Sequence, residues 1–220
     1  KVNVQEMLSL VATCVQFCSD KVSITWHMFE EIRSDKNDKV IWYKDPKLSA
    51  KIKTKLTTSG IAVDANKLQP CSKYRIRIEG DVGKGLPGLA EYSFITDCPP
   101  EGGTCTVDRS HGIAMETEFG FSCQGWTDED FPLRYEFLIQ EDGDYKLILH
   151  EGQDSFKRIY LPAGDSANNF TLVVLLRVYD TFKAYNETKV TLQVTEIAYC
   201  LISLNNIEIR FFTCCCQWHG

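Results

Sequence analysis

Apolar and polar residues alternate along most of the chain, and this alternation predicts β-strands. In residues 22–29, Val22, Ile24 and Trp26 fall on one face at a period of two. A polar cluster at residues 34–39 separates this run from a second apolar run at residues 40–43. The pattern predicts a β-hairpin whose buried face carries Trp26.

Residues 44–64 alternate in the same way, with Leu48, Ile52 and Leu56 set among several lysines. We interpret these lysines as the solvated face of an edge strand, where they discourage pairing with another sheet. A basic patch from Lys44 to Lys55 that binds an anionic glycan is the alternative. Residues 1–5 alternate like residues 186–194, so we expect them to be the closing strand of a preceding unit.

The spacing Leu68-x-Pro70-x-x-x-Tyr74 precedes a predicted strand at residues 75–80. Proline fixes the backbone at a corner, where a tyrosine can bury its ring while its hydroxyl bonds the upstream backbone. The spacing resembles the entry to the sixth strand of fibronectin type III domains, as in the tyrosine corner of related sandwiches. It predicts a first sandwich with Trp26 and Tyr74 in its core.

A short linker follows this first sandwich. Pro99 forces extended backbone on Cys98, and Gly102-Gly103 permits a change of direction. We therefore expect one domain over residues 1–97 and a second over residues 98–195. Residues 196–220 break the strand pattern, and we expect an unstructured tail or a terminus that arises from splicing or gene prediction.

The second half repeats the strand pattern, with apolar runs on both sides of Asp142-Gly143, a dipeptide favoured in type I′ hairpin turns. Trp126 follows Trp26 by roughly one hundred residues, the length of one sandwich. We interpret that spacing as an internal repeat and place Trp126 and Tyr135 in the second core. The predicted fold class is all-β, with two tandem fibronectin-III-like or immunoglobulin-like β-sandwiches.

The composition narrows the range of partners. The chain has 220 residues and a formal net charge of -6, and its acidic residues are scattered through predicted turns. This distribution disfavours nucleic acid as a partner. We expect no membrane span in these residues, and we interpret the sequence, which has no initiating Met and no signal peptide, as a piece of a longer protein.

Ten cysteines are many for a cytosolic protein of this size and typical of a secreted or cell-surface one. Cys105 and Cys123 flank one hairpin-length segment, so we expect a disulfide that staples neighbouring strands. Four further candidates, Cys14, Cys18, Cys71 and Cys98, allow three pairings, and the sequence does not choose among them. Asn169 and Asn186 begin N-glycosylation sequons, which also favour an oxidising compartment.

Enzymatic and metal chemistry have little support. The histidines lie far apart in the sequence with no nucleophile motif, so we expect no catalytic residue and no cofactor. Cys214-Cys215-Cys216 with His219 lacks the paired spacing of tetrahedral zinc sites. Acidic runs at residues 128–130 and 141–144 do not fit an EF-hand calcium loop and are interpreted as hairpin turns.

Many small matches in a fixed order surround the linker. They are Pro99, Pro100, Gly102, Gly103, Cys105, Gly112, Phe121, Cys123, Gly125, Trp126, Pro132, Leu133, Tyr135, Leu161, Pro162 and Asp180. This order resembles the receptor-for-egg-jelly (REJ) module of polycystin-family membrane proteins. The resemblance runs from about Cys14 to Val194 and is strongest between Cys98 and Asp180.

The resemblance implies a semi-rigid extracellular element for ligand contact, adhesion or force transmission, on the outer side of the cell surface or ciliary membrane. Its ectodomain ligand would be a protein or a glycan. The longer protein would be linked to calcium-permeable channel signalling through a polycystin-2-type channel subunit. The alternatives are a generic pair of adhesion or receptor modules and a glycan-binding module that uses the Lys44–Lys55 face.

Overall fold

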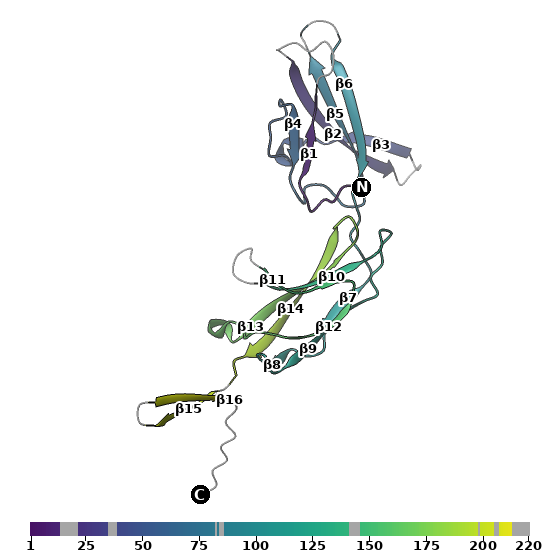
Figure 1. Ribbon diagram of the computed structural model, residues 1–220. Coiled ribbons are helices and arrows are strands. Elements are labelled where there is room, and N and C mark those ends of the chain that lie inside the picture. Colours follow the sequence, from purple (N-terminus) through teal and green to yellow (C-terminus); the bar gives the residue numbers. More distant parts are fainter. Residues whose placement is uncertain are drawn as a thin grey trace. The chain divides into compact units, whose positions relative to one another are not determined.

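The structure, a computed structural model, describes residues 1–13, 22–34, 39–81, 83, 86–140, 146–197, 199–204 and 207–212. The chain divides into two compact units (Figure 1). Unit 1 comprises Lys1–Pro99 and Phe182–Ala184, and unit 2 comprises Pro100–Thr181 and Tyr185–Gly220. Among the described residues, helix is limited to two short 3-10 turns, Leu48–Ala50 and Ser166–Asn168. The predicted all-β fold class is confirmed.

Unit 1 is a β-sandwich of two antiparallel sheets. One sheet pairs β1 (Leu8–Val11) with β4 (Gly60–Val63). The other has the order β3 (Lys39–Lys44), β2 (Ser23–Ser34), β5 (Lys73–Asp81) and β6 (Gly88–Ile95). Inward-facing side chains from both sheets form the core, among them Trp26, Met28, Ile61 and Tyr74. Alternation along each strand thus buries one face and leaves the other in solvent.

The corner before β5 brings a buried tyrosine against the backbone. The Tyr74 side chain is only 1% exposed, and its hydroxyl accepts a hydrogen bond from Gln69 N at 2.9 Å. Burial raises the pKa of the Tyr74 phenol, which therefore stays protonated at neutral pH. Trp26, on β2, is also buried and donates its indole N–H to Thr58 O at 2.8 Å.

Residues 1–5 belong to unit 1, contrary to the expectation that they close a preceding unit. Val2 N donates to Ile95 O at 3.0 Å, and Asp97 N donates to Val2 O at 2.8 Å. Val2 therefore forms a parallel bridge with Thr96, just beyond the end of β6. A five-residue alternation predicts a strand but contains no information about which strand it pairs with.

The expectation of a continuous alternating strand over residues 44–64 is wrong. The Asp45 carboxylate accepts a hydrogen bond from Lys47 N at 2.8 Å, which starts a turn that leads into the 3-10 helix at Leu48–Ala50. Leu48 is buried, and Ile52 and Leu56 pack against the core. These apolar residues therefore line the core from turns, and only β4 at the end of the segment is a strand.

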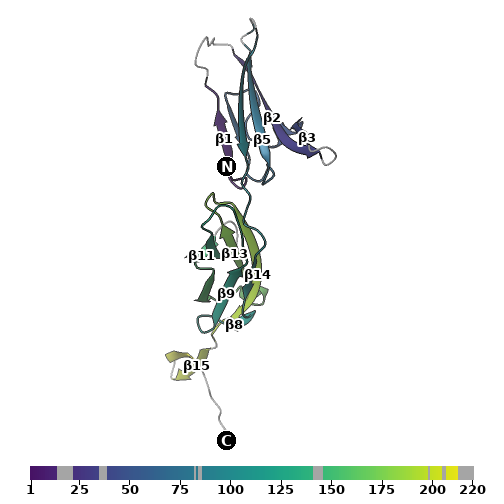
Figure 2. The same cartoon turned by 90° about the vertical axis from the view of Figure 1, so that its right-hand side faces the viewer.

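Unit 2 is a second, larger sandwich (Figure 2). Its five-stranded sheet has the order β11 (Lys146–Gly152), β10 (Arg134–Gln140), β13 (Thr171–Tyr179), β14 (Tyr185–Thr195) and β8 (His111–Ile113). Its three-stranded sheet has the order β12 (Phe156–Tyr160), β9 (Glu118–Gln124) and β7 (Thr104–Val107). Fully buried Phe119, Phe121, Phe137 and Leu176 lie in the core between them.

The spacing between Trp26 and Trp126 is not a structural repeat. Trp26 lies on β2 opposite Ile78, and the residue in the matching place on unit 2 is Tyr135, on β10 opposite Val178. Trp126 follows β9 outside any strand and is half-buried against the core. The spacing of roughly one hundred residues between the two tryptophans therefore does not mark equivalent positions in the two units.

The expectation of an unstructured tail is wrong for residues 199–204 and 207–212. There β15 (Tyr199–Leu204) and β16 (Ile207–Phe212) pair as antiparallel strands. Each apolar run is long enough to form a short strand, so together they make a hairpin. The triple cysteine and His219 lie outside the described residues.

Candidate interaction surfaces

The outer face of the four-stranded sheet in unit 1 carries a cluster of arginines and aromatic rings. The Arg75 guanidinium lies 4.1 Å from the centre of the Trp42 ring, and the Arg77 guanidinium lies 5.1 Å from that of Phe29. Arg77 Nη2 also contacts Glu91 Oε1 at 2.6 Å. We call Phe29, Trp42, Arg75, Arg77 and Glu91 the unit 1 outer-face cluster. Such cation–π contacts are worth roughly 0.5–1 kcal/mol each at exposed sites.

A tighter cluster occupies the outer face of the five-stranded sheet in unit 2. Arg177 Nε donates to Glu187 Oε2 at 2.7 Å, and Arg177 Nη1 lies 3.5 Å from Glu136 Oε2. The guanidinium also lies 4.7 Å from the centre of the Tyr185 ring. We call these four residues, with Tyr179, the unit 2 outer-face cluster. Only 12% of the Arg177 side chain is exposed, so its charge is held largely by the two carboxylates.

Tyr179 completes the hydrogen-bond network of this cluster. Its hydroxyl donates to Glu136 Oε2 at 2.7 Å and accepts from Arg177 Nη1 at 3.3 Å. Burial of the phenol, and next the hydrogen bond to Glu136, raise the pKa of Tyr179 to about 12. The phenol is therefore a neutral donor throughout the physiological range.

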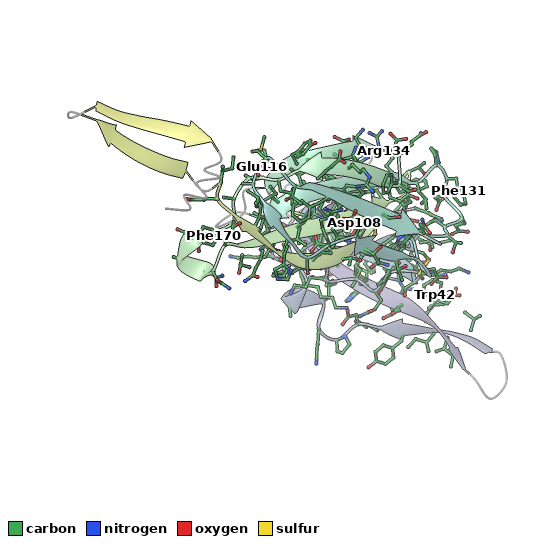
Figure 3. The ribbon with its side chains drawn as sticks, turned by 90° about the horizontal axis from the view of Figure 1, so that it is seen from below. Trp42, Asp108, Glu116, Phe131, Arg134 and Phe170 are labelled. Carbon is green, nitrogen blue, oxygen red and sulfur yellow. A yellow bond between two sulfur atoms is a disulfide. The ribbon has the colours of Figure 1, made fainter. Side chains whose placement is uncertain are left out.

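The two clusters occupy matching places. Arg77 on β5 lies between His27 on β2 and Glu91 on β6. Arg177 on β13 lies between Glu136 on β10 and Glu187 on β14. Side chains from the two units can be followed in Figure 3, where Trp42 and Arg134 are labelled. The sequence analysis predicted neither cluster. Alignment of the strands pairs an arginine on β5 with a glutamate on β6 in unit 1, and an arginine on β13 with a glutamate on β14 in unit 2.

These surfaces offer rings and paired charges rather than reactive groups. Arg77 and Arg177 are engaged by carboxylates, and the described residues contain no group of three or more His, Cys, Asp or Glu that could hold a metal ion. The Asp128 carboxylate accepts from Asp130 N at 2.8 Å, within a turn of its own run. The other acidic run, residues 141–144, lies outside the described residues.

Two disulfides join strands or strand ends within single units. Cys105 on β7 and Cys123 on β9 are bonded and lie directly opposite each other, with their Cα atoms 4.0 Å apart. Cys71 and Cys98 are also bonded, with Cα atoms 4.8 Å apart, which links the start of β5 to the residue before Pro99. Cys14 and Cys18 lie outside the described residues.

The two sequon asparagines lie in different settings. Asn169 is exposed at the end of the 3-10 turn that precedes β13, in the left-handed conformation with a φ of 53°. Asn186 is exposed on β14, and its side-chain amide donates a hydrogen bond to Pro100 O at 2.7 Å. The Asn169 amide therefore projects from a turn, whereas the Asn186 amide is held against the start of unit 2.

Two glycines of unit 2, Gly103 and Gly112, lie where a larger residue would collide with neighbouring side chains. The Trp126 indole lies directly on the α-carbon of Gly103, so any side chain at position 103 would collide with the ring. Gly112 on β8 is similarly closed in by Thr117 and Phe119. Tyr135 is half-buried against the same core, and burial raises the pKa of its phenol. Trp126 thus seals the edge of the unit 2 core rather than its centre.

The lysines of residues 44–55 do not form a uniform basic face. Lys51 Nζ lies 2.7 Å from Asp45 Oδ2, and Lys53 Nζ lies 3.1 Å from Asp64 Oδ1. A sulfated or carboxylated glycan would have to compete with these carboxylates. The pairing weakens the case for a glycan-binding patch.

Known proteins similar to this chain identify its family. The REJ domain model matches residues 1–199. The chain is 28% identical over 123 residues to the human polycystin family receptor for egg jelly, a match that covers 50% of this chain and 5% of that protein. It is 30% identical over 129 residues to mouse polycystin-1-like protein 1, covering 56% of this chain and 5% of that protein. The chain thus matches about one-twentieth of the length of these relatives.

Solved structures that align with this chain include the chicken CNTN1 FN1–FN3 domains and a marsupial T cell receptor. The chicken CNTN1 FN1–FN3 domains align over 87% of this chain and 64% of theirs, with 9% identity and a TM-score of 0.40. A marsupial T cell receptor aligns over 91% of this chain and 74% of its own, with 10% identity and a TM-score of 0.36. No helix in the described part of the chain is long and apolar enough to span a bilayer. On the match over residues 1–199, this chain belongs to the REJ domain family.

Proposed function

We propose that the chain is a load-bearing and ligand-facing part of the extracellular region of a polycystin-like membrane protein. Its family and the two disulfides among its described residues support this location, since disulfides persist in oxidising compartments. The exposed sequon at Asn169 fits the same setting. In this proposal the chain is not an enzyme, and protein ligands meet exposed side chains of the sheets and loops.

Parallel backbone pairing just beyond β6 in unit 1 and along the end of β14 in unit 2 supports the proposal of force transmission. In unit 1, Val2 bridges Thr96 in parallel. In unit 2, β8 runs parallel to the end of β14, with Ala114 N donating to Thr195 O and Gln193 N donating to Ser110 O, each at 2.8 Å. Opposite forces on the two ends of a unit would load these hydrogen bonds together, in shear, rather than one after another.

Stiffness of the linker is part of the same proposal. Two consecutive prolines restrict the backbone, and the Cys71–Cys98 bond anchors the residue before them to the turn that precedes β5. Signalling through a calcium-permeable channel, a polycystin-2-type partner subunit and a ciliary location would be properties of the longer protein. The names of the relatives support only the polycystin-like character of that longer protein.

Single-molecule stretching of the whole chain between marker domains tests the load-bearing role. Gln193→Pro removes the N–H that donates to Ser110 O, so unit 2 should unfold at a clearly lower force. Gln193→Ala keeps that N–H and is the matched control. Reduction should add about 65 Å to the extension of unit 2, because the 18-residue separation of Cys105 and Cys123 is released at roughly 3.6 Å per residue. Equal unfolding forces for both variants would refute the shear mechanism.

A further inference from the structure

One row of outward-facing residues crosses the four-stranded sheet of unit 1. Lys44 on β3 lies opposite Phe29 on β2, and Phe29 also lies opposite Arg75 on β5. Lys44 is exposed, Phe29 is half-buried and 31% of the Arg75 side chain is exposed. Because neighbouring strands are about 4.8 Å apart, the Cα atoms of Lys44 and Arg75 are about 10 Å from each other. The row therefore holds two cations on either side of an aromatic ring.

The guanidinium of Arg75 is positioned by an aromatic ring rather than by a carboxylate. It lies 4.1 Å from the centre of the Trp42 ring, a contact that spans β2. Its Nη1 is 3.7 Å from Glu91 Oε2, whereas the same carboxylate is bound more closely by Arg77 Nη2, 2.6 Å from Oε1. Among the described residues, the Arg75 side chain makes one hydrogen bond, from Nε to Ser93 Oγ at 3.4 Å. Both Nη groups therefore keep donors for a ligand.

Lys44 is a second cation without a nearby carboxylate. In the part of the chain that the structure describes, it makes no ion pair and no side-chain hydrogen bond. Two described acidic residues, Glu31 and Glu91, lie in the neighbouring rows. Lys73 Nζ lies 3.5 Å from Glu31 Oε1, and Glu91 contacts the arginines of β5. Two lysines and two arginines thus share three rows with two carboxylates, although the formal net charge of the whole chain is -6.

We propose that Phe29, Trp42, Lys44 and Arg75, called the Lys44–Arg75 patch, bind an acidic segment of a partner protein. One carboxylate of the segment accepts hydrogen bonds from both Nη groups of Arg75, whose planar geometry suits a carboxylate, and a second contacts the Lys44 ammonium. An apolar residue between them packs on the exposed parts of the two rings. Arginine and aromatic side chains supply much of the binding energy at protein interfaces. The inference rests on the proposed ligand-facing role and specifies the chemistry of the ligand.

The spacing of the cations favours an extended protein segment over a glycan. In the polyproline II conformation, residues three positions apart lie on one side of the chain, about 9 Å from each other. Two acidic residues at this interval match the separation of Lys44 and Arg75. A densely sulfated glycan would also meet Glu31 and Glu91, whose negative charges lie in the neighbouring rows. Charge complementarity therefore favours two separate carboxylates.

Fluorescence anisotropy of a dye-labelled peptide tests the patch in the 220-residue chain. The probe is a short peptide with Glu-Pro-Leu-Glu at its centre and Gly/Ser flanks, and the control peptide has Gln in place of both Glu residues. We expect the Glu peptide to bind at least tenfold more tightly than the Gln peptide at low ionic strength. Added salt should weaken this binding, because the patch is exposed.

Matched variants remove the same charge from two parts of unit 1. Lys44→Gln combined with Arg75→Gln should weaken binding of the Glu peptide at least tenfold. Lys47→Gln combined with Lys55→Gln removes two exposed lysines from the turns between β3 and β4 and should change binding less than twofold. Arg75→Lys keeps the charge without the planar fork and should give an intermediate loss. Near-ultraviolet circular dichroism checks that each variant is folded.

Three outcomes overturn the proposal. Equal losses in the two double variants would show that the peptide senses only the overall charge of unit 1. Tighter binding of a heparin oligosaccharide than of the Glu peptide, with the same dependence on Arg75, would make the patch a glycan site. No binding of the Glu peptide up to about 1 mM would reject the proposed ligand chemistry. The load-bearing role is tested separately, because the unfolding force of the Gln193→Pro variant does not depend on this patch.

Discussion

The two outer-face clusters place arginines at matching positions of two sandwiches, but the arginines differ in exposure and in the number of carboxylates that they contact. Arg77 and Arg177 occupy matching positions on β5 and β13, each facing a glutamate on the last strand. The Arg77 side chain is 34% exposed beside one carboxylate, whereas the Arg177 side chain is 12% exposed between two. Burial decides how much each network contributes, because solvent screens exposed ion pairs and a desolvated charge depends on its partners.

The same contrast holds in the cores. Phe121 on β9 is fully buried beside β7, while Leu10 on β1 of unit 1 is half-buried and lines an apolar groove with Ile78 and Leu89. Core-facing residues of the two units thus differ in burial through their neighbours rather than through their own strands. Four predictions test the comparison of the two units, in order of decreasing effect.

The largest difference is expected between Phe121→Ala and Leu10→Ala. Phe121→Ala should lower the free energy of unfolding of unit 2 by about 3–5 kcal/mol, since it leaves a cavity in a closed core. Leu10→Ala should lower that of unit 1 by only about 1–2 kcal/mol, because water already reaches the groove. Urea denaturation with hydrogen exchange resolved to each unit measures both. Equal losses would show that the groove is effectively closed.

The arginines should differ by a smaller amount. Arg177→Ala removes the positive charge that lies between Glu136 and Glu187 and should lower the free energy of unfolding by about 2 kcal/mol. Arg77→Ala should lower it by about 0.5–1 kcal/mol, as for an exposed pair. Arg177→Lys, which keeps the charge but not the planar geometry, is the control and should lie between them. A larger loss at Arg77 would reverse the comparison.

The tyrosine corner gives a third contrast. Tyr74→Phe leaves Gln69 N without its acceptor and should lower the free energy of unfolding of unit 1 by about 1 kcal/mol. Tyr135→Phe in unit 2 should change it by less than about 0.5 kcal/mol, because no hydrogen bond connects that phenol to another described residue. Denaturant midpoints measured at constant m-value separate the two outcomes, and similar effects of the two substitutions would argue against a role for the corner.

The smallest effect at neutral pH concerns Tyr179, whose pKa is raised to about 12. The folded state holds this proton more tightly than the unfolded state, so the contribution is complete below the unfolded pKa near 10 and is lost as pH rises to about 12. The pKa values of Tyr74 and Tyr135 are raised as well, so an ultraviolet titration should show Tyr179 ionising within a group of late tyrosines, and Tyr179→Phe should lower the absorbance change near pH 12 by one tyrosine. An unchanged absorbance step near pH 12 in Tyr179→Phe would contradict the assignment.

Several features of the fold followed from local sequence. The period-two runs predicted strands in both halves, and the Leu68-Pro70-Tyr74 spacing predicted a corner whose hydroxyl contact to Gln69 N is present in the structure. The expected Cys105–Cys123 pair is joined across β7 and β9. The Trp26–Trp126 repeat, the assignment of residues 1–5 to a preceding unit and the unstructured tail were wrong, because each required knowledge of which strands meet.

By itself, the sequence determined that this protein is built from strands, which face of each strand is apolar, and that its pattern resembles the REJ family. Alternation at a period of two is a local property, and it reports burial without naming the partner. The tertiary structure decided that Arg177 meets two carboxylates, that Cys71 joins Cys98, and that β7 pairs with β9 in unit 2, whereas β1 of unit 1 pairs only with β4 among the described residues. These outcomes depend on strand order and register between segments far apart in the chain, which are set by how two sheets together bury one core.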